Sequence, residues 1–186
     1  MAERRSALAR LPAATGTRIA LSEVRPGTIL QLHAWPQTLD TVRRIITELL
    51  MMSAPAIGHA ESAAGITIAA IAPGRFLIAA EAGDLLQRFE AALTADAGTV
   101  SDVSHGRVIL KLEGATAQDL LQACVMIDLD SAAFPPGRVA QTMVHHIDVV
   151  IHRRSETHFE LWVLRSFAET LAEWLGDIHG GYKGYF

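Results

Sequence analysis

Residues 158–175 read HFELWVLRSFAETLAEWL, which is an apolar strand-like run, a short break, and a helix-like stripe that includes Leu171 and Trp174. The same succession of strand, turn and leucine-rich helix occurs at residues 75–93 and again at residues 107–125. Runs rich in β-branched and aromatic residues are typical of strands, whereas apolar residues three and four apart are typical of one helix face. The recurring unit therefore predicts sheets with helices packed on them.

Working outward, strands outnumber helices by about two to one. The predicted strands cover residues 17–24, 28–32, 66–71, 75–80, 100–103, 107–112, 139–144, 148–152 and 158–164. The predicted helices cover residues 39–51 and 84–95, one that Thr116 caps with Asp119, and one that Ser166 caps with Glu169. Paired strands interrupted by helices indicate an α+β fold with small, largely antiparallel sheets.

Two strand pairs support the antiparallel arrangement. Residues 66–71 and 75–80 flank Ala72-Pro73-Gly74, a turn sequence that predicts a hairpin. Residues 100–103 and 107–112 are expected to pair in the same way.

The chain divides into three parts by composition. Residues 1–16 mix charge, Ala, Pro and Gly without a period, and we expect them to form a flexible arm. Residues 17–178 are predicted to form a single α+β domain with two pseudo-repeated lobes, at about residues 17–96 and 97–178. The glycine-rich, aromatic residues 179–186 are expected to be a flexible tail.

Composition excludes several classes of protein. The formal net charge is −4, which lacks the basic footprint of a nucleic-acid binder. Charged residues make up only 19% and apolar residues 50% of the chain, so we expect an apolar face buried against another subunit, with a well-packed, alanine-rich core as the alternative. The apolar runs are too short for a membrane helix, and the basic N-terminus lacks the apolar stretch of a signal peptide. We therefore expect a cytoplasmic protein.

Candidate chemical groups are few. The phosphate-binding, nucleophile-elbow and zinc-protease motifs are missing from the sequence. On a regular strand His146, Asp148 and His152 would share one face, but the two histidines would lie about 20 Å apart, too far for one metal ion. Cys124, the only cysteine, is expected to be an inert packing residue.

The remaining large or charged side chains have structural interpretations. Trp35, Trp162 and Trp174 are expected to be core or interface anchors, with stacking on a ring ligand as the alternative. The arginine pairs at residues 43–44 and 153–154 are expected to mark solvated faces or loop ends, with a subunit contact as the alternative.

Several stretches of the second half form a pattern of their own. They are Asp102-Val103-Ser104-His105-Gly106-Arg107, Gly114, Phe134-Pro135-Pro136-Gly137-Arg138-Val139-Ala140-Gln141-Thr142, Arg165-Ser166-Phe167-Ala168 and Trp174-Leu175. This pattern resembles the gamma subunit family of heterotetrameric sarcosine oxidase. The resemblance spans about residues 100–175, residues 72–76 also fit, and residues 1–60 add little. More distantly the chain is similar to the glycine cleavage T-protein, which implies a folate-binding fold of small antiparallel sheets with packed helices.

The catalytic residues of the T-proteins are not carried over with the fold. In those proteins the strand matching residues 147–152 carries paired aspartates after a Gly-Gly turn. Here that place reads His145-His146-Ile147-Asp148-Val149-Val150, so only Asp148 remains. A carboxylate without its neighbour makes a poor acid–base site, and the chain is about half as long as a T-protein. The resemblance therefore implies no catalytic, cofactor-binding or metal-binding residue in this chain.

What the resemblance implies is a non-catalytic, structural subunit of an oxidase that demethylates sarcosine to glycine, a one-carbon unit and hydrogen peroxide. Its partners would be the alpha, beta and delta subunits, which would hold FAD, FMN, NAD, tetrahydrofolate and zinc. Without them we expect the apolar docking face to produce a homo-oligomer. The alternative is a free-standing folate or one-carbon binding module.

Overall fold

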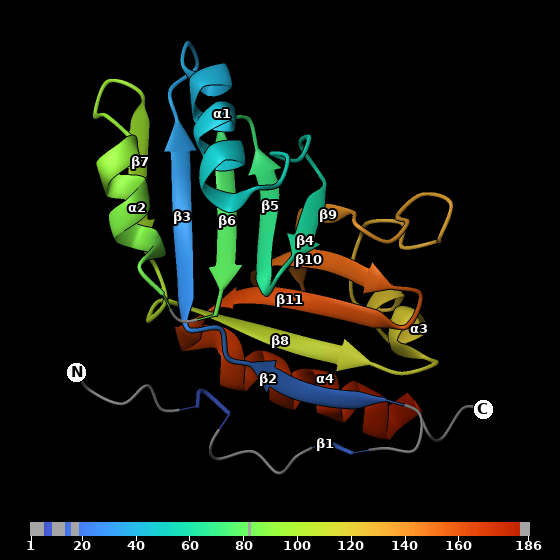
Figure 1. The fold of residues 1–186 in the computed structure, drawn as a ribbon. Coiled ribbons are helices and arrows are strands. Elements are labelled where there is room, and N and C mark those ends of the chain that lie inside the picture. Colours follow the sequence, from blue (N-terminus) through green and yellow to red (C-terminus); the bar gives the residue numbers. More distant parts are fainter. Residues whose placement is uncertain (1–5, 9–13, 16–18, 82, 183–186) are drawn as a thin grey trace. The chain divides into compact units, whose positions relative to one another are not determined.

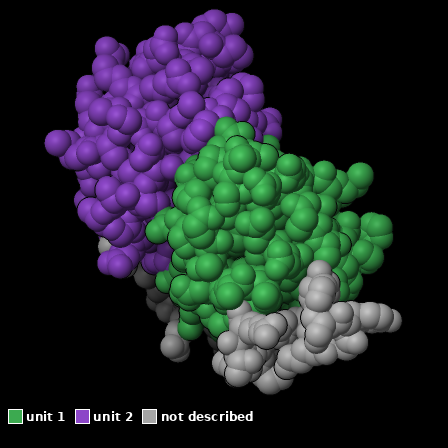
Figure 2. All heavy atoms as spheres, turned by 90° about the vertical axis from the view of Figure 1, so that its right-hand side faces the viewer, with its two compact units in different colours: residues 1–25, 105–186 green, residues 26–104 purple. Residues whose placement is uncertain are grey.

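The computed structural model describes residues 6–8, 14–15, 19–81 and 83–182. The chain divides into two compact units, which Figure 2 distinguishes by colour. Unit 1 comprises residues 1–25 and 105–186, and unit 2 comprises residues 26–104. Each unit contains one antiparallel sheet with helices on it (Figure 1).

Unit 1 is built on a six-stranded sheet in the order β1-β2-β8-β11-β10-β9. Its strands are β1 (Ala14–Thr15), β2 (Ala20–Val24), β8 (Arg107–Glu113), β9 (Val139–Val144), β10 (Ile147–Ser155) and β11 (His158–Leu164). Its helices are α3 (Ala117–Gln122) and α4 (Ala168–Tyr182), the second preceded by the 3₁₀ turn η1 (Arg165–Phe167). One face of the sheet packs on these helices, so that Leu110 and Leu161 share a core with Leu171.

Unit 2 contains a five-stranded sheet in the order β4-β5-β6-β3-β7. Its strands are β3 (Thr28–Ala34), β4 (Ala60–Ala63), β5 (Ile66–Ala72), β6 (Arg75–Ala80) and β7 (Gly98–Asp102), and its helices are α1 (Leu39–Leu50) and α2 (Leu85–Ala92). Val42, Ile46 and Phe89 of the helices pack on Leu32 and Ile78 of the sheet. Gly98 lies so near β3 that a Cβ there would meet the His33 carbonyl oxygen at 2.3 Å.

The α+β prediction is confirmed, and so is the recurring strand–turn–helix unit. It appears as β6 followed by α2, β8 followed by α3, and β11 followed by η1 and α4. The predicted hairpin around Gly74 is the antiparallel pair β5–β6. The apolar periodicity was informative because in both units one sheet face packs on the helices.

Three local predictions are wrong. Residues 100–103 and 107–112 do not pair, because β7 joins β3 in one sheet while β8 joins β2 and β11 in the other. Thr116 precedes α3 but forms no side-chain capping hydrogen bond. Ser166 lies inside η1 instead of capping α4.

The units also differ in their limits from the lobes expected at about residues 17–96 and 97–178. β2 pairs with β8, so residues 20–24 belong to the sheet of the C-terminal half. Of the expected arm, residues 14–15 pair with β2, while Ser6 Oγ and the Ala7 amide donate hydrogen bonds to the Glu23 carboxylate. Residues 1–5, 9–13 and 16 lie outside the described residues, as do 183–186 of the expected tail, whose residues 179–182 continue α4.

Every helix within the described residues is too short or too polar to cross a bilayer.

Candidate functional site

The β9–β10 hairpin holds residues 145–150, the stretch in which the resemblance to the T-proteins was expected to leave one aspartate, Asp148. Its two-residue turn is His145-His146, and His145 has a left-handed backbone with φ of 57°. The His145 ring stacks on Trp174 of α4 with centroids 4.8 Å apart and lies 4.1 Å from the His146 ring. The structure thus places His146 in the turn, so the prediction that it shares a strand face with Asp148 and His152 is wrong.

Asp148 lies one residue into β10 and is exposed. It lines a pocket of about 610 Å³ on unit 1. The other lining residues are Arg107, Cys124, Met126, Gln141, Thr142, Met143, His145, Val149, Val150 and Leu164. Asp148 is the one carboxylate among these lining residues.

Cys124 follows α3 and is half-buried beside the same pocket. Its Sγ donates a hydrogen bond to the Leu120 carbonyl at 2.9 Å. Burial raises the pKa of the Cys124 thiol to about 11, so the thiol stays protonated at neutral pH. A protonated thiol is a weak nucleophile and a poor metal ligand, which supports the packing role expected for Cys124.

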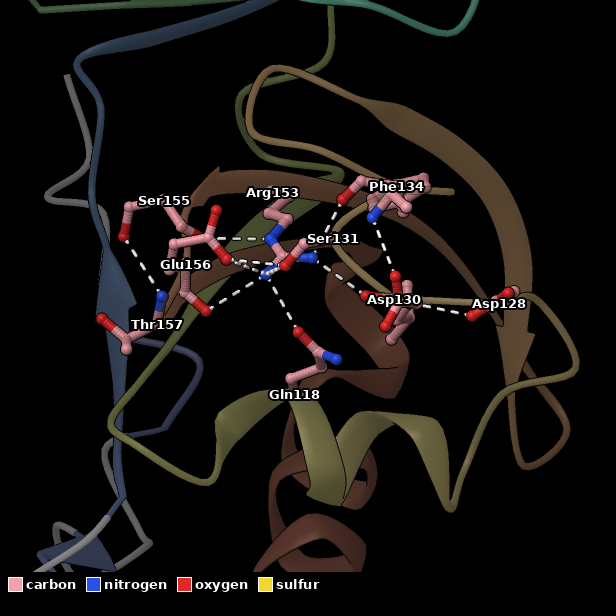
Figure 3. Close-up of polar contacts among 11 residues, drawn as sticks. Gln118, Asp128, Asp130, Ser131, Phe134, Arg153, Ser155, Glu156 and Thr157 are labelled. Atoms are coloured by element: carbon pink, nitrogen blue, oxygen red, sulfur yellow. Dashed lines mark hydrogen bonds and ion pairs between the residues drawn. The ribbon is translucent and has the colours of Figure 1, made fainter.

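Arg153 forms the densest polar network shown by the described residues (Figure 3). Its guanidinium is fully buried, and Nη1 donates to the Leu129 and Phe134 carbonyls at 2.9 and 3.0 Å. Nη2 donates to Gln118 Oε1 and Ser131 Oγ at 2.9 and 3.0 Å. The prediction that this arginine marks a solvated face is therefore wrong.

The Arg153 network fixes the position of an irregular loop. Most of the acceptors lie on the loop formed by residues 123–138, between α3 and β9, or on the turn that follows β10. Arg153 also lies over the Phe159 ring, 5.2 Å from its centroid. A planar guanidinium can bind several carbonyls at once, so one side chain holds a long irregular loop against the sheet.

A second polar cluster lies on the sheet face opposite the α3 and α4 core. His152 Nδ1 is 3.3 Å from Glu160 Oε2, and Arg154 Nε is 3.6 Å from Glu160 Oε1. Burial by itself raises the pKa of Glu160, but the hydrogen bond to His152 and the charge of Arg154 outweigh it and lower the pKa. Glu160 is thus a largely buried carboxylate with a neighbour at each oxygen, His152 at one and Arg154 at the other, and the cluster serves packing on this sheet face.

The described residues contain no group of three or more His, Cys, Asp or Glu side chains placed to hold one metal ion. The three tryptophans occupy different environments. Trp162 is fully buried on β11, Trp35 Nε1 donates to the Ala95 carbonyl at 2.8 Å, and Trp174 carries the His145 stack. Trp162 therefore lies in the core as expected, whereas Trp35 is half-buried and its role stays a prediction.

Comparison with known proteins identifies the family. Residues 42–180 match the profile of the "Sarcosine oxidase, gamma subunit family". The chain belongs to this family.

Two further similarities agree with it. The sarcosine oxidase subunit gamma of Corynebacterium sp. strain U-96 is 32% identical over 182 residues, which cover 94% of this chain and 89% of that protein. A chain of the heterotetrameric sarcosine oxidase from Corynebacterium sp. U-96 in complex with pyrrole 2-carboxylate superimposes with a TM-score of 0.85 at 29% identity, over 96% of both chains.

A more distant similarity concerns the fold alone. The glycine cleavage system aminomethyltransferase T from Bartonella henselae matches with a TM-score of 0.62 at 17% identity, over 85% of this chain and 45% of that one. The folate-binding type of α+β fold, expected from the resemblance, is thereby confirmed for this gamma-family chain.

Sequence reasoning missed the two polar clusters of this subunit. It treated Arg153-Arg154 as one surface pair and gave Glu160 no role. Strand alternation contained the signal: Arg153 shares its face with Val149 and Ile151, which pack in the core, whereas Arg154 lies on the face of His152.

Proposed function

We propose that this chain is a non-catalytic gamma subunit that stabilises a heterotetrameric sarcosine oxidase in the cytoplasm. The observation that carries the proposal is the match to a chain of such an oxidase over 96% of both chains. In this proposal the partners are the alpha, beta and delta subunits. They hold FAD, FMN, NAD, tetrahydrofolate and zinc, and together they oxidise the N-methyl group of sarcosine.

The chemistry of the described side chains supports a non-catalytic role. The strand that matches the T-protein aspartates keeps one carboxylate, Asp148, and its turn is filled by His145 and His146. The Cys124 thiol is protonated at neutral pH, and the Arg153 guanidinium is committed to holding the 123–138 loop. Cys124 and Arg153 are thus engaged in packing, and Asp148 lacks the second carboxylate that a paired acid–base site would use.

Co-expression tests the proposal. An affinity-tagged copy of this chain is produced together with the alpha, beta and delta subunits of a sarcosine oxidase from the same source, and the captured material is analysed for composition, flavin absorption and peroxide production from sarcosine. We expect a stoichiometric complex that is yellow and active, whereas the chain alone is colourless and inactive. Failure of the wild-type chain to capture these subunits, or turnover by the chain alone, would overturn the proposal.

The alternative folate-binding module is tested in parallel. Isolated chain is titrated with tetrahydrofolate and followed by calorimetry. Under the subunit proposal no saturable binding is expected, whereas stoichiometric binding by the isolated chain would favour the module.

A further inference from the structure

β9 forms one edge of the unit 1 sheet. β9 is the last strand in the sheet order and pairs with β10 alone among the described strands. It reads VAQTMV, with no charged residue and no proline. Edge strands usually carry such residues, or a bulge, because an unguarded edge pairs with any extended chain that reaches it. The sequence of β9 is therefore typical of a strand whose outer edge is covered when the protein functions.

The register shows which backbone groups of β9 face outward. The two-residue turn makes Val144 and Ile147 the closing hydrogen-bonded pair of the hairpin, and hydrogen-bonded pairs then recur at every second residue. Beyond β9 the Arg153 amide donates to the Arg138 carbonyl at 3.0 Å, which continues this alternation. Met143, one residue from the closing pair, consequently directs its N–H and C=O away from β10.

Exposed apolar side chains gather at the same place. Among the described residues of unit 1, four large apolar side chains are exposed, namely Met126, Met143, Leu164 and Phe167. Three of them line the pocket beside β9, with exposed fractions of 96% for Met126, 51% for Met143 and 43% for Leu164. Flexible, polarisable methionines at a surface are typical of binding sites for apolar side chains.

The charged residues beside β9 indicate which kind of segment would pair with this strand. Across the β9–β10 ladder the partner of Met143 is Asp148, which is exposed and is the one carboxylate in the pocket lining, whereas Arg107 in the same lining has an interaction of its own. A strand added beside β9 would place its own side chains next to Met143, within reach of that carboxylate for a long basic residue. A segment with alternating apolar residues and one lysine or arginine is therefore complementary to this edge.

We propose that a partner subunit of the oxidase adds an extended segment to β9, with apolar side chains in the Met126–Met143–Leu164 pocket and a basic side chain facing Asp148. This mode is β-augmentation, in which the main chain supplies hydrogen bonds and the pocket supplies specificity. The inference rests on the proposed function, and it names the surface by which the subunit docks.

The experiment compares variants in the co-expressed, purified complex, whose dissociation is followed by mass photometry on dilution. Met143→Pro removes the outward N–H, and Met126→Lys puts a charge into the pocket; each is expected to weaken assembly at least about tenfold. Met143→Leu keeps the amide, and Met51→Lys changes a methionine of unit 2 that is 88% exposed; both controls are expected to assemble within about twofold of wild type.

Two further measurements address the backbone and the charge. Hydrogen exchange of the Met143 amide should be fast in the free chain and slowed in the complex, because the added strand accepts its hydrogen bond. Asp148→Lys should weaken assembly more than Asp148→Asn does, and added salt should reduce the difference.

The outcomes separate the two proposals. If wild-type chain captures no partner, the proposed function fails. If wild type assembles but Met126→Lys and Met143→Pro assemble equally well, and the Met143 amide exchanges as in the free chain, the docking surface alone is overturned. The docking surface is also overturned if Met143→Pro abolishes a homodimer of the isolated chain but leaves the complex intact. In that case β9 pairs with a second copy of this chain. Met126 lies outside the strand, so this test stands even if Met143→Pro does not fold.

Discussion

Arg153 and Glu156 form an ion pair across the boundary of the core: Nη2 lies 2.7 Å from Oε2, yet the Arg153 side chain is fully buried and that of Glu156 is 63% exposed. Solvent screens an exposed carboxylate, so this pair contributes little by itself. The Leu129 and Phe134 carbonyls are buried acceptors at 2.9 and 3.0 Å from Nη1. They depend on Arg153 far more than Glu156 does.

Replacement of Arg153 should therefore be severe. Arg153→Met leaves buried carbonyls of the 123–138 loop without a donor, and we expect it to lower the free energy of unfolding by about 3 kcal/mol or more. Glu156→Gln is the matched control, with an expected loss of at most about 1 kcal/mol. Urea denaturation followed by circular dichroism measures both values. If both variants lose the same free energy of unfolding, the hydrogen bonds from Arg153 to the loop carbonyls are not its main contribution.

The turn at His145 permits a test of backbone strain against ring stacking. His145 adopts φ of 57°, where a Cβ is unfavourable, and its ring stacks on Trp174. His145→Gly and His145→Ala both remove the stack, but only glycine relieves the backbone. We expect His145→Gly to be more stable than His145→Ala by about 1 kcal/mol. Thermal unfolding of the two variants decides the order, and a less stable glycine variant would show that the turn is unstrained.

Strands and helices were predictable here because both are encoded by local periodicity. The stripe in residues 39–51 reflects a helix that buries one side, whereas the continuous apolar run in residues 158–164 reflects a strand buried on both faces. Local sequence patterns do not indicate which strands pair. β7 and β8 are neighbours in sequence, but β7 pairs with β3, whereas β8 pairs with β2 and β11. β4 was missed because its sequence, AESA, has no strand-like residues and its pairing with β5 supplies the order.

The buried polar residues were hidden for a related reason. The partners of Arg153 include Gln118 and Leu129, which lie 35 and 24 residues away along the chain. No short window shows that these groups converge. Asp148, in contrast, was located correctly from sequence as a lone carboxylate on a strand, because that judgement needed only its immediate neighbours.

Cys124 gives a chemical test of burial. With its pKa raised to about 11, the thiol at pH 8 should react with iodoacetamide about a hundredfold more slowly than in urea-unfolded chain, where the ordinary value of 9.0 applies. The chain has one cysteine, so mass spectrometry reports on this thiol alone. Comparable rates in folded and unfolded chain would mean that the loop after α3 opens readily.

Acid should destabilise the subunit in two steps, set by His158 and Glu160. Burial lowers the pKa of His158 below its usual 6.5, against the opposing charge of Glu160, and His158 Nε2 is buried without a hydrogen-bond partner among the described residues. The folded state thus favours neutral His158, so its contribution to stability is present above pH 6.5 and is lost as the pH falls below that value.

Glu160 acts at lower pH and with the same sign. Its lowered pKa means that the folded state favours the carboxylate, whose contribution is present above pH 4.5 and is lost as the pH falls through the folded value. The free energy of unfolding should therefore decrease just below pH 6.5 and again below pH 4.5. Urea melts at half-unit pH steps measure both slopes. His158→Gln should flatten the first slope. A first slope that persists in His158→Gln would show that another group titrates there, because glutamine cannot take up the proton.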